Sequence, residues 1–173
     1  VKIICIAGEH LSEYIFNQEP DFTSYFKIIA DFDDVTVRNE TTTAQYVHFI
    51  SRLMREEALG EITPDGIAAV LEHAVRLAEQ KNKFSTLFSR LADLLREASY
   101  WAGQAHTSSI DREVVRKTLH EQEFCVNKTA EKLDEMIMEG ELALNVTASE
   151  VGRVNALSVV EQGYFAFGKP VRV

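Results

Sequence analysis

The pattern that looks most like a chemical site lies near the C-terminus. Gly163, Gly168 and Lys169 match the beginning of the phosphate-binding P-loop pattern. A P-loop also needs a Ser or Thr hydroxyl for magnesium directly after the lysine, and a helix that begins there. Here Pro170 follows the lysine, bulky aromatic residues fill the loop, and an extended Val-Arg-Val segment comes next. We therefore expect no phosphate cradle at this position.

The histidines and cysteines do not form a metal-binding pattern. The histidines stand at positions 10, 48, 73, 106 and 120, with no pair at ligand spacing, and Cys5 and Cys125 are far apart. His48 and His73 fall on amphipathic segments, where a place at the surface or the edge of the core is expected. No nucleophile elbow surrounds any serine. The sequence predicts neither a metal site nor a catalytic residue within this chain.

Charge and hydropathy exclude two classes of partner. The chain has 18 Lys and Arg against 27 Asp and Glu, a net charge of −9. A nucleic-acid binder or a protein of anionic membrane surfaces needs a basic face, so we expect neither partner. A helix-turn-helix DNA-binding protein is the weakest alternative for the same reason. The longest apolar run, residues 3–7, is too short to span a membrane, and no secretory signal precedes it. We expect a cytoplasmic protein.

The elements change type along the chain. Residues 1–7 read as a strand buried on both faces, 11–17 as a short helix and 26–32 as a second strand or an extended segment, together the end of an α/β core. Both chain ends read as strand interiors, which predicts a piece of a longer protein. After residue 140 a two-residue alternation at 142–146 and a strand at 151–160 predict the start of a β-rich domain.

Between these ends the hydropathy period is helical. Helices are expected from about residue 41, ending before Gly60 as the C′ residue; from Pro64, with Thr63 as N-cap; and from near Ser85. Another is capped by residue 108 or 109, and a last one covers 130–139 and ends at Gly140. The third helix turns Leu94, Leu95, Ala98 and Trp101 inward, which predicts one apolar core.

This order of parts, together with several short segments, resembles a known family. The chain is similar to Lon-related ATP-dependent proteases of the LonB type, whose nucleotide site is closed by a helical AAA+ lid. The segments that carry the resemblance are 26–34 (FKIIADFDD), 76–79 (RLAE), 88–102 (FSRLADLLREASYWA), 152–159 (GRVNALSV) and 167–170 (FGKP).

The resemblance implies a fold class and domain boundaries. The fold is then mainly α, a lid-type helical bundle preceded by the end of an α/β core and followed by a small β segment. Residues 1–38 end the AAA+ core, 39–126 form the lid, and 127–173 form a linker helix and the β-rich start of the protease domain. The family's Ser-Lys dyad is expected beyond residue 173, and the Walker motifs before residue 1.

The resemblance also implies an activity. The parent protein is expected to be an ATP-dependent serine endopeptidase, a homo-oligomer (a hexamer) that acts on protein substrates with ATP and Mg²⁺. This chain by itself is expected to be non-catalytic and to hold no cofactor. Its role is then to couple the nucleotide state to the protease domain.

Two positions depart from the family pattern. Thr23 and Leu87 stand where relatives carry arginines that reach the γ-phosphate. Such a cation stabilises charge that develops during phosphoryl transfer. Arg90, three residues beyond Leu87 and on nearly the same helical face, is the candidate replacement for the second arginine. The alternatives are a degenerate Lon homologue that no longer hydrolyses ATP, and a helical adaptor that never contacts nucleotide.

Overall fold

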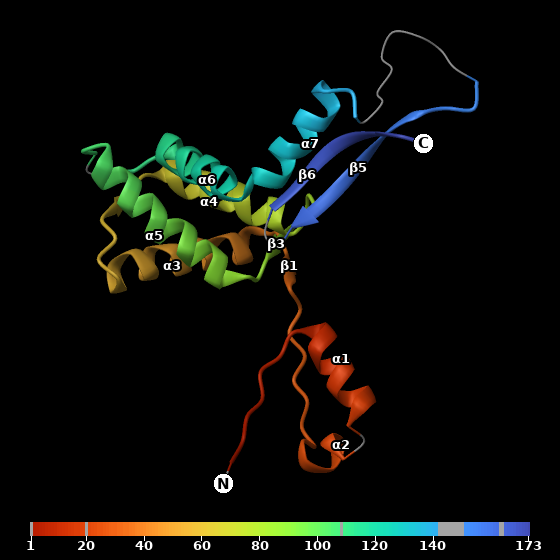
Figure 1. The fold of residues 1–173 in the computed structure, drawn as a ribbon. Coiled ribbons are helices and arrows are strands. Elements are labelled where there is room, and N and C mark those ends of the chain that lie inside the picture. Colours follow the sequence, from red (N-terminus) through yellow and green to blue (C-terminus); the bar gives the residue numbers. More distant parts are fainter. Residues whose placement is uncertain (1, 20, 108, 142–150, 163–164) are drawn as a thin grey trace. The chain divides into compact units, whose positions relative to one another are not determined.

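The computed structural model describes residues 2–19, 21–107, 109–141, 151–162 and 165–173. The chain divides into two compact units, Val1–Asp33 and Asp34–Val173 (Figure 1). No helix in the described part of the chain is both long enough and apolar enough to cross a membrane.

The first unit contains two helices, α1 (Glu9–Gln18) and α2 (Phe22–Tyr25). The ring of Phe22 stacks on Phe26 at 4.4 Å and meets the edge of Phe16 at 5.3 Å. The helix expected at 11–17 is therefore confirmed as α1. The small aromatic contact ties α1 to the segment that follows it.

The strand expected at residues 1–7 is wrong, and residues 26–32, expected to be a strand or an extended segment, do not form a strand. Residues 2–7 and 26–32 have no strand structure, and Ile4 and Ile6 are 86 % and 95 % exposed. A strand is defined by hydrogen bonds to a neighbouring strand. Among the described residues of this unit no such neighbour exists, so a β-branched apolar run stays extended and unpaired. The β-branched apolar residues favour a strand, but a strand forms only where a second strand is present to pair with it.

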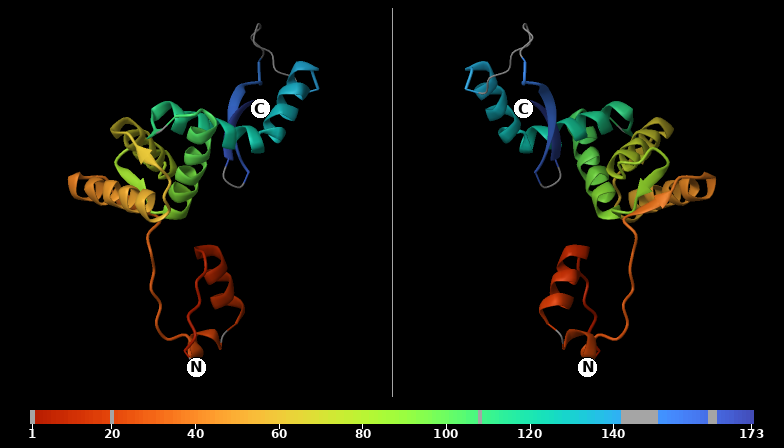
Figure 2. Two further views of the ribbon diagram at one scale, coloured as in Figure 1. Left: turned by 90° about the vertical axis from the view of Figure 1, so that its left-hand side faces the viewer. Right: turned by 90° about the vertical axis from the view of Figure 1, so that its right-hand side faces the viewer.

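The second unit is dominated by helices, so the mainly α class with a small C-terminal β segment is confirmed. Its elements are β1 (Val35–Val37), α3 (Glu40–Glu56), β2 (Glu61–Ile62), α4 (Pro64–Leu77), β3 (Lys83–Ser85), α5 (Phe88–Gln104), β4 (Ser109–Ile110), α6 (Arg112–Val126), α7 (Lys128–Met138), β5 (Asn155–Gln162) and β6 (Phe165–Arg172). Helices α3, α4, α5 and α6 gather around one core (Figure 2).

Side chains at the helix starts fix where the helices begin. Asn39 forms a capping box with Thr42: its Oδ1 accepts the Thr42 N–H at 2.8 Å, and the Thr42 hydroxyl accepts the Asn39 N–H. Thr63 caps α4 as predicted, accepting the Gly66 N–H at 3.1 Å. The cap of α6 is Asp111, not residue 108 or 109, because Ser109 belongs to strand β4.

The predicted helix ends are partly wrong. Gly60 is not the C′ residue of α3; Ala58 takes that place with φ 51°, and the Leu59 N–H donates to Met54 O at 3.0 Å. This bond is the long bond of a Schellman motif, which compensates the strain of a left-handed alanine. Gly140, with φ 78°, does follow α7 as expected. Helix α5 begins at Phe88 rather than near Ser85, because Ser85 is held in strand β3.

The predicted apolar faces do form the core. Leu91, Leu94, Leu95 and Ala98 are at most 1 % exposed and point from α5 into the bundle. The other buried members of the cluster are Tyr46, Ile50, Met54, Ala69, Val70, Ala74, Phe84, Ala102, Ile110, Val114 and Val115. Trp101 reaches only the margin of this core: it is partly buried, and the Lys117 ammonium lies 4.4 Å from its ring centre.

Two very short strand pairs join the helices. β1 pairs antiparallel with β3, and β2 pairs in parallel with β4. The second pair places Gly66 against the backbone of Ile110, so close that a β-carbon on Gly66 would lie 2.4 Å from the Ile110 carbonyl oxygen. A glycine is therefore required where α4 passes β4.

The C-terminal part combines α7 with the β5–β6 hairpin. The strands pair antiparallel, from Asn155 opposite Arg172 to Gln162 opposite Phe165. The strand expected at 151–160 is confirmed but begins later, at Asn155. Gly168 and Lys169 lie inside β6, which confirms that they do not open a phosphate-binding helix. The alternation expected at 142–146 lies outside the described residues.

Candidate functional site

The candidate site is the beginning of α5, where Arg90 lies in the first turn. Strand β3 leads directly into this helix and is held from two sides. Its residues Lys83, Phe84 and Ser85 pair with β1. The buried hydroxyl of Tyr46 on α3 donates to the carbonyl oxygen of Ser85 at 2.6 Å. The start of α5 is therefore fixed to α3 by one hydrogen bond inside the core.

An aromatic cluster adds to this attachment. The Tyr46 ring stacks on Phe84 at 4.7 Å and lies 5.2 Å from Phe88, and the Phe49 ring lies 4.9 Å from Phe88. Aromatic pairs at these distances contribute about 0.5–1.5 kcal/mol each beyond their burial. Burial also raises the pKa of Tyr46 above its ordinary value, so its hydroxyl remains a donor. The first turn of α5 is held in one position.

The backbone at this helix start is capped in an unusual way. Leu87 takes the N-cap position, which leaves α5 without a side-chain cap. The Ser85 hydroxyl accepts the Leu87 N–H at 3.3 Å, and the Phe88 N–H donates to Thr86 O at 2.8 Å. Leu87 itself is 38 % exposed. Leucine at this position provides neither a cap nor a charge.

Charge at the site comes from α4 and α5 together. His73 on α4 is partly buried, and burial, followed by the nearby guanidinium groups of Arg76 and Arg90, lowers its pKa to about 4. His73 is therefore neutral at pH 7, and the positive charge belongs to the two arginines. Arg90 is itself half-buried. A partly desolvated cation interacts with an anion more strongly than one in open water.

A second feature is an open hollow of about 600 Å³ at the start of α3, lined by Arg38, Asn39, Glu40, Thr43, Ala44 and Val47. Arg38 Nη1 donates to Lys81 O at 3.5 Å, at the limit for a hydrogen bond. The Asn39 side chain is occupied by its capping role.

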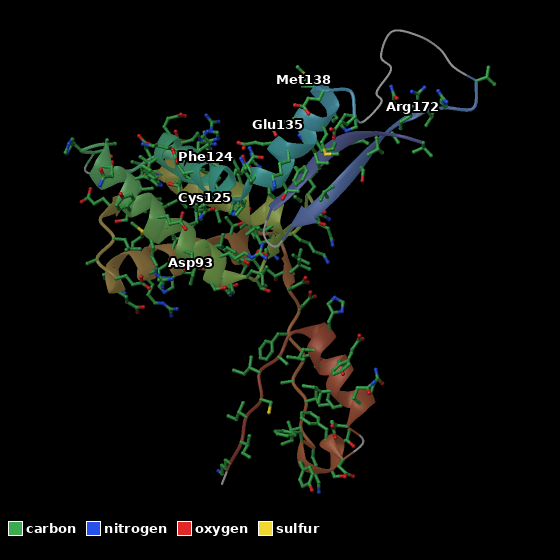
Figure 3. All side chains as sticks on the ribbon, viewed as in Figure 1. Asp93, Phe124, Cys125, Glu135, Met138 and Arg172 are labelled. Atoms are coloured by element: carbon green, nitrogen blue, oxygen red, sulfur yellow. The ribbon has the colours of Figure 1, made fainter. Side chains whose placement is uncertain are left out.

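The structure brings some of the predicted residues together and not others. Arg90 and Leu87 share the start of α5, whereas Thr23 lies on α2 in the other unit. Cys5 and Cys125 are free and exposed, the latter near the end of α6 (Figure 3). Among the residues that the structure describes, no group of three or more His, Cys, Asp and Glu is placed to hold a metal ion.

The sequence does not reveal the proximity of His73 to Arg90. His48 is exposed and His73 lies at the core edge, as expected of both. The signal that points toward His73 is spacing: it is three residues after Val70 and four before Leu77, on the flank of the apolar stripe of α4. Spacing predicts partial burial, but it does not say which residue of α5 lies opposite.

The comparison with protein families matches one segment of the chain. Residues 61–124 match the family described as archaeal LonB, AAA+ ATPase LID domain. The matched span begins with β2 and ends two residues before the end of α6, so it covers three of the four helices around the core. No curated protein matches the chain. The match shows that residues 61–124 are similar to the AAA+ ATPase lid domain of LonB-type, Lon-related proteins.

Proposed function

We propose that this chain is the helical lid and linker of a Lon-like ATP-dependent serine protease, and that it couples the nucleotide state to the protease domain without being catalytic itself. The observation that carries this proposal is the position of Arg90, in the first turn of a helix that lies within the matched lid segment. The parent protein is proposed to be a cytoplasmic hexamer that degrades protein substrates.

The role proposed for the chain follows from its own residues. The core holds α5 against α6 and α3, so a force on Arg90 acts on the whole bundle and not on one side chain alone. ATP with Mg²⁺ supplies the phosphoryl-transfer chemistry when it is bound to the parent protein. Arg90 would hold positive charge toward the phosphate that is transferred, and its desolvation favours that contact.

The described residues fit contact with a nucleotide held elsewhere and do not fit a phosphate cradle. A cradle needs a loop whose backbone N–H groups are available to phosphate oxygens. The only glycine-lysine pair in the chain, Gly168 and Lys169, lies in β6 opposite Val159 and Ser158. The Walker motifs and the Ser-Lys dyad are therefore proposed to belong to other parts of the parent protein.

The first experiment asks whether the isolated 173-residue chain is inert. We expect no casein cleavage and no ATP hydrolysis above background. Cleavage that is retained after repurification and in the presence of inhibitors of contaminating proteases would contradict the proposal.

The second experiment tests Arg90 in the full-length parent. Arg90→Ala is expected to lower the ATPase rate at least about tenfold, equivalent to about 1.4 kcal/mol in the barrier. Arg52→Ala is the matched control, because Arg52 lies on α3 and pairs with Glu56, one turn away at 3.8 Å. An ATPase rate that Arg90→Ala leaves unchanged would remove Arg90 from the mechanism.

Thr23 and Leu87 favour a second candidate, a lid that has lost its response to ATP. Both positions lack the charge that the family pattern has there. In that case the wild-type parent hydrolyses ATP negligibly, and Leu87→Arg combined with Thr23→Arg restores part of the rate. Robust wild-type hydrolysis that does not change on Arg90→Ala would contradict both candidates.

A further inference from the structure

The β5–β6 hairpin has two unlike faces. The register places Leu157 and Val159 on one face, where they are 72 % and 64 % exposed. The opposite face carries Ser158, Val160 and Lys169, which are all half-buried. A two-stranded hairpin alone is marginally stable in water. The half-buried face therefore needs support from another element.

Helix α7 provides that support through its contact with β6 (Figure 1). Four residues at helical spacing line one face of α7: Ala130, which is 5 % exposed, the half-buried Leu133 and Ile137, and Asp134 between them. The apolar part of this stripe is short. A polar contact has to complete the attachment.

Lys169 and Asp134 make that contact. The Lys169 ammonium forms an ion pair with the Asp134 carboxylate, and the Lys169 side chain is only 14 % exposed while that of Asp134 is 61 % exposed. The ammonium also lies 5.8 Å from the centre of the Phe167 ring on the same strand. A lysine covered to this degree is costly to leave without its anion. The Lys169–Asp134 ion pair is therefore lost whenever the hairpin leaves α7.

We propose that the Lys169–Asp134 ion pair is a latch that fastens the β5–β6 hairpin to α7, so that helix and hairpin move as one body. This body meets the helical bundle at Asn127, the single residue between α6 and α7, which has φ −76° and ψ −5°. When the ion pair is broken, the hairpin can change its orientation relative to α7. The latch is a property of this chain and does not depend on the proposed function.

A distance measurement between spin labels tests the latch in the 173-residue chain. The labels are placed at Glu135→Cys on α7 and Val159→Cys on the exposed hairpin face, in a Cys5→Ser, Cys125→Ser background (Figure 3 shows Glu135). The unaltered pair should give one narrow distance distribution, and Lys169→Met, which keeps the aliphatic stem, should broaden it. A narrow distribution in Lys169→Met, or a broad one with the pair intact, would overturn the proposal.

The matched control is Glu131→Gln. It removes an ion pair of similar type within α7, Lys128 with Glu131 at 3.9 Å, which does not involve the hairpin. The distribution should stay narrow in this variant. If Glu131→Gln broadened the distance distribution as much as Lys169→Met does, any change in the charge of α7 would have the same effect, and the latch would be overturned.

Hydrogen exchange gives an independent readout through a double-mutant cycle. Asp134→Asn and Lys169→Met should each speed exchange of the β5 and β6 amides by about fivefold, a change typical of losing one partly buried ion pair. Because both variants break the same contact, the double variant should exchange no faster than the faster single one. Additive effects would show that the two residues act separately and would refute the latch.

Discussion

Gly66→Ala should destabilise the helical bundle even though alanine is the better helix former. The new β-carbon would lie 2.4 Å from the Ile110 carbonyl oxygen and 3.0 Å from Cγ1 of Ile62. The first of these atoms belongs to the backbone and cannot rotate away. Ordinary contact begins near 3.4 Å, so α4 and β4 have to separate by roughly 1 Å.

The size of the effect follows from three contributions. Overpacking of this kind costs about 1–3 kcal/mol. The shift also weakens the bond from the Thr63 N–H to Ile110 O, now 3.0 Å, at a cost of about 1 kcal/mol. Helix propensity returns up to about 1 kcal/mol for replacing glycine by alanine. The net expectation is a loss of about 2 kcal/mol in the free energy of unfolding.

Gly103→Ala is the matched control, because a β-carbon added to Gly103 in α5 would meet nothing within 4 Å. It should stabilise the bundle by about 0.5–1 kcal/mol. Urea unfolding followed by the fluorescence of Trp101, the single tryptophan, measures both variants on the same body. We expect the midpoint to fall by about 1 M for Gly66→Ala and to rise for Gly103→Ala. A Gly66→Ala midpoint equal to or above that of the wild type would refute the close packing of α4 on β4.

Three further substitutions test the bundle. Burial and two neighbouring guanidinium groups lower the pKa of His73 from 6.5 to about 4, so between these pH values the unfolded chain binds a proton that the folded chain does not. The free energy of unfolding should therefore fall as the pH drops from 6.5 toward 4. His73→Gln should reduce this dependence of the melting temperature on pH, as measured by thermal melts. Trp101→Ala should lower the free energy of unfolding by about 2 kcal/mol. This is less than the loss for a fully buried aromatic residue, because Lys117 and the edge of the core cover only part of the Trp101 ring. Urea unfolding followed by circular dichroism measures the change. Arg96→Met should lower the melting temperature, because it removes the two hydrogen bonds from Arg96 to Glu57 at 2.6 and 2.7 Å. These hydrogen bonds lower the pKa of Glu57 from its ordinary value of 4.5. The difference in melting temperature between the variant and the wild type should therefore shrink below pH 4.5 and at high salt.

The helical part of the fold was predictable because its determinants are local. The inward face of α5 follows from the spacing of Leu91, Leu94, Leu95 and Ala98, and the start of α4 follows from Thr63 and the proline after it. Each of these signals lies within one or two helical turns. Periodicity therefore predicts the correct faces even though several of the helix ends were misplaced.

The misplaced elements depend on distant partners. The unpaired segments 2–7 and 26–32 have strand composition, but a strand also requires a neighbour that no local pattern supplies. Helix ends at Ala58, Glu79 and His106 take positive φ without glycine, because backbone bonds across the last turn stabilise them. The rule that glycine ends helices misses all three.

The candidate site divides in the same way. Placing Arg90 on the first turn of a helix required only the helical period of α5. Its proximity to His73 depends on how α4 packs against α5, which is a tertiary distance. The aromatic attachment of Tyr46 to Ser85, which fixes the start of α5, joins residues 39 positions apart and has no sequence signature.

The parallel pairing of β2 with β4 has an electrostatic consequence. Both strands lead directly into helices, so α4 and α6 begin side by side, and the partial positive charges of two helix dipoles accumulate at one end of the bundle. Acidic residues lie there: Asp65 and Glu113 occupy the first turns, and Asp111 caps α6. The guanidinium of Arg112 lies 4.0 Å from the Asp65 carboxylate, so this carboxylate interacts both with Arg112 and with the positive ends of the two helix dipoles. The negative charge at this end offsets a repulsion that the strand pairing creates, and a lysine at either first-turn position would oppose both helices at once.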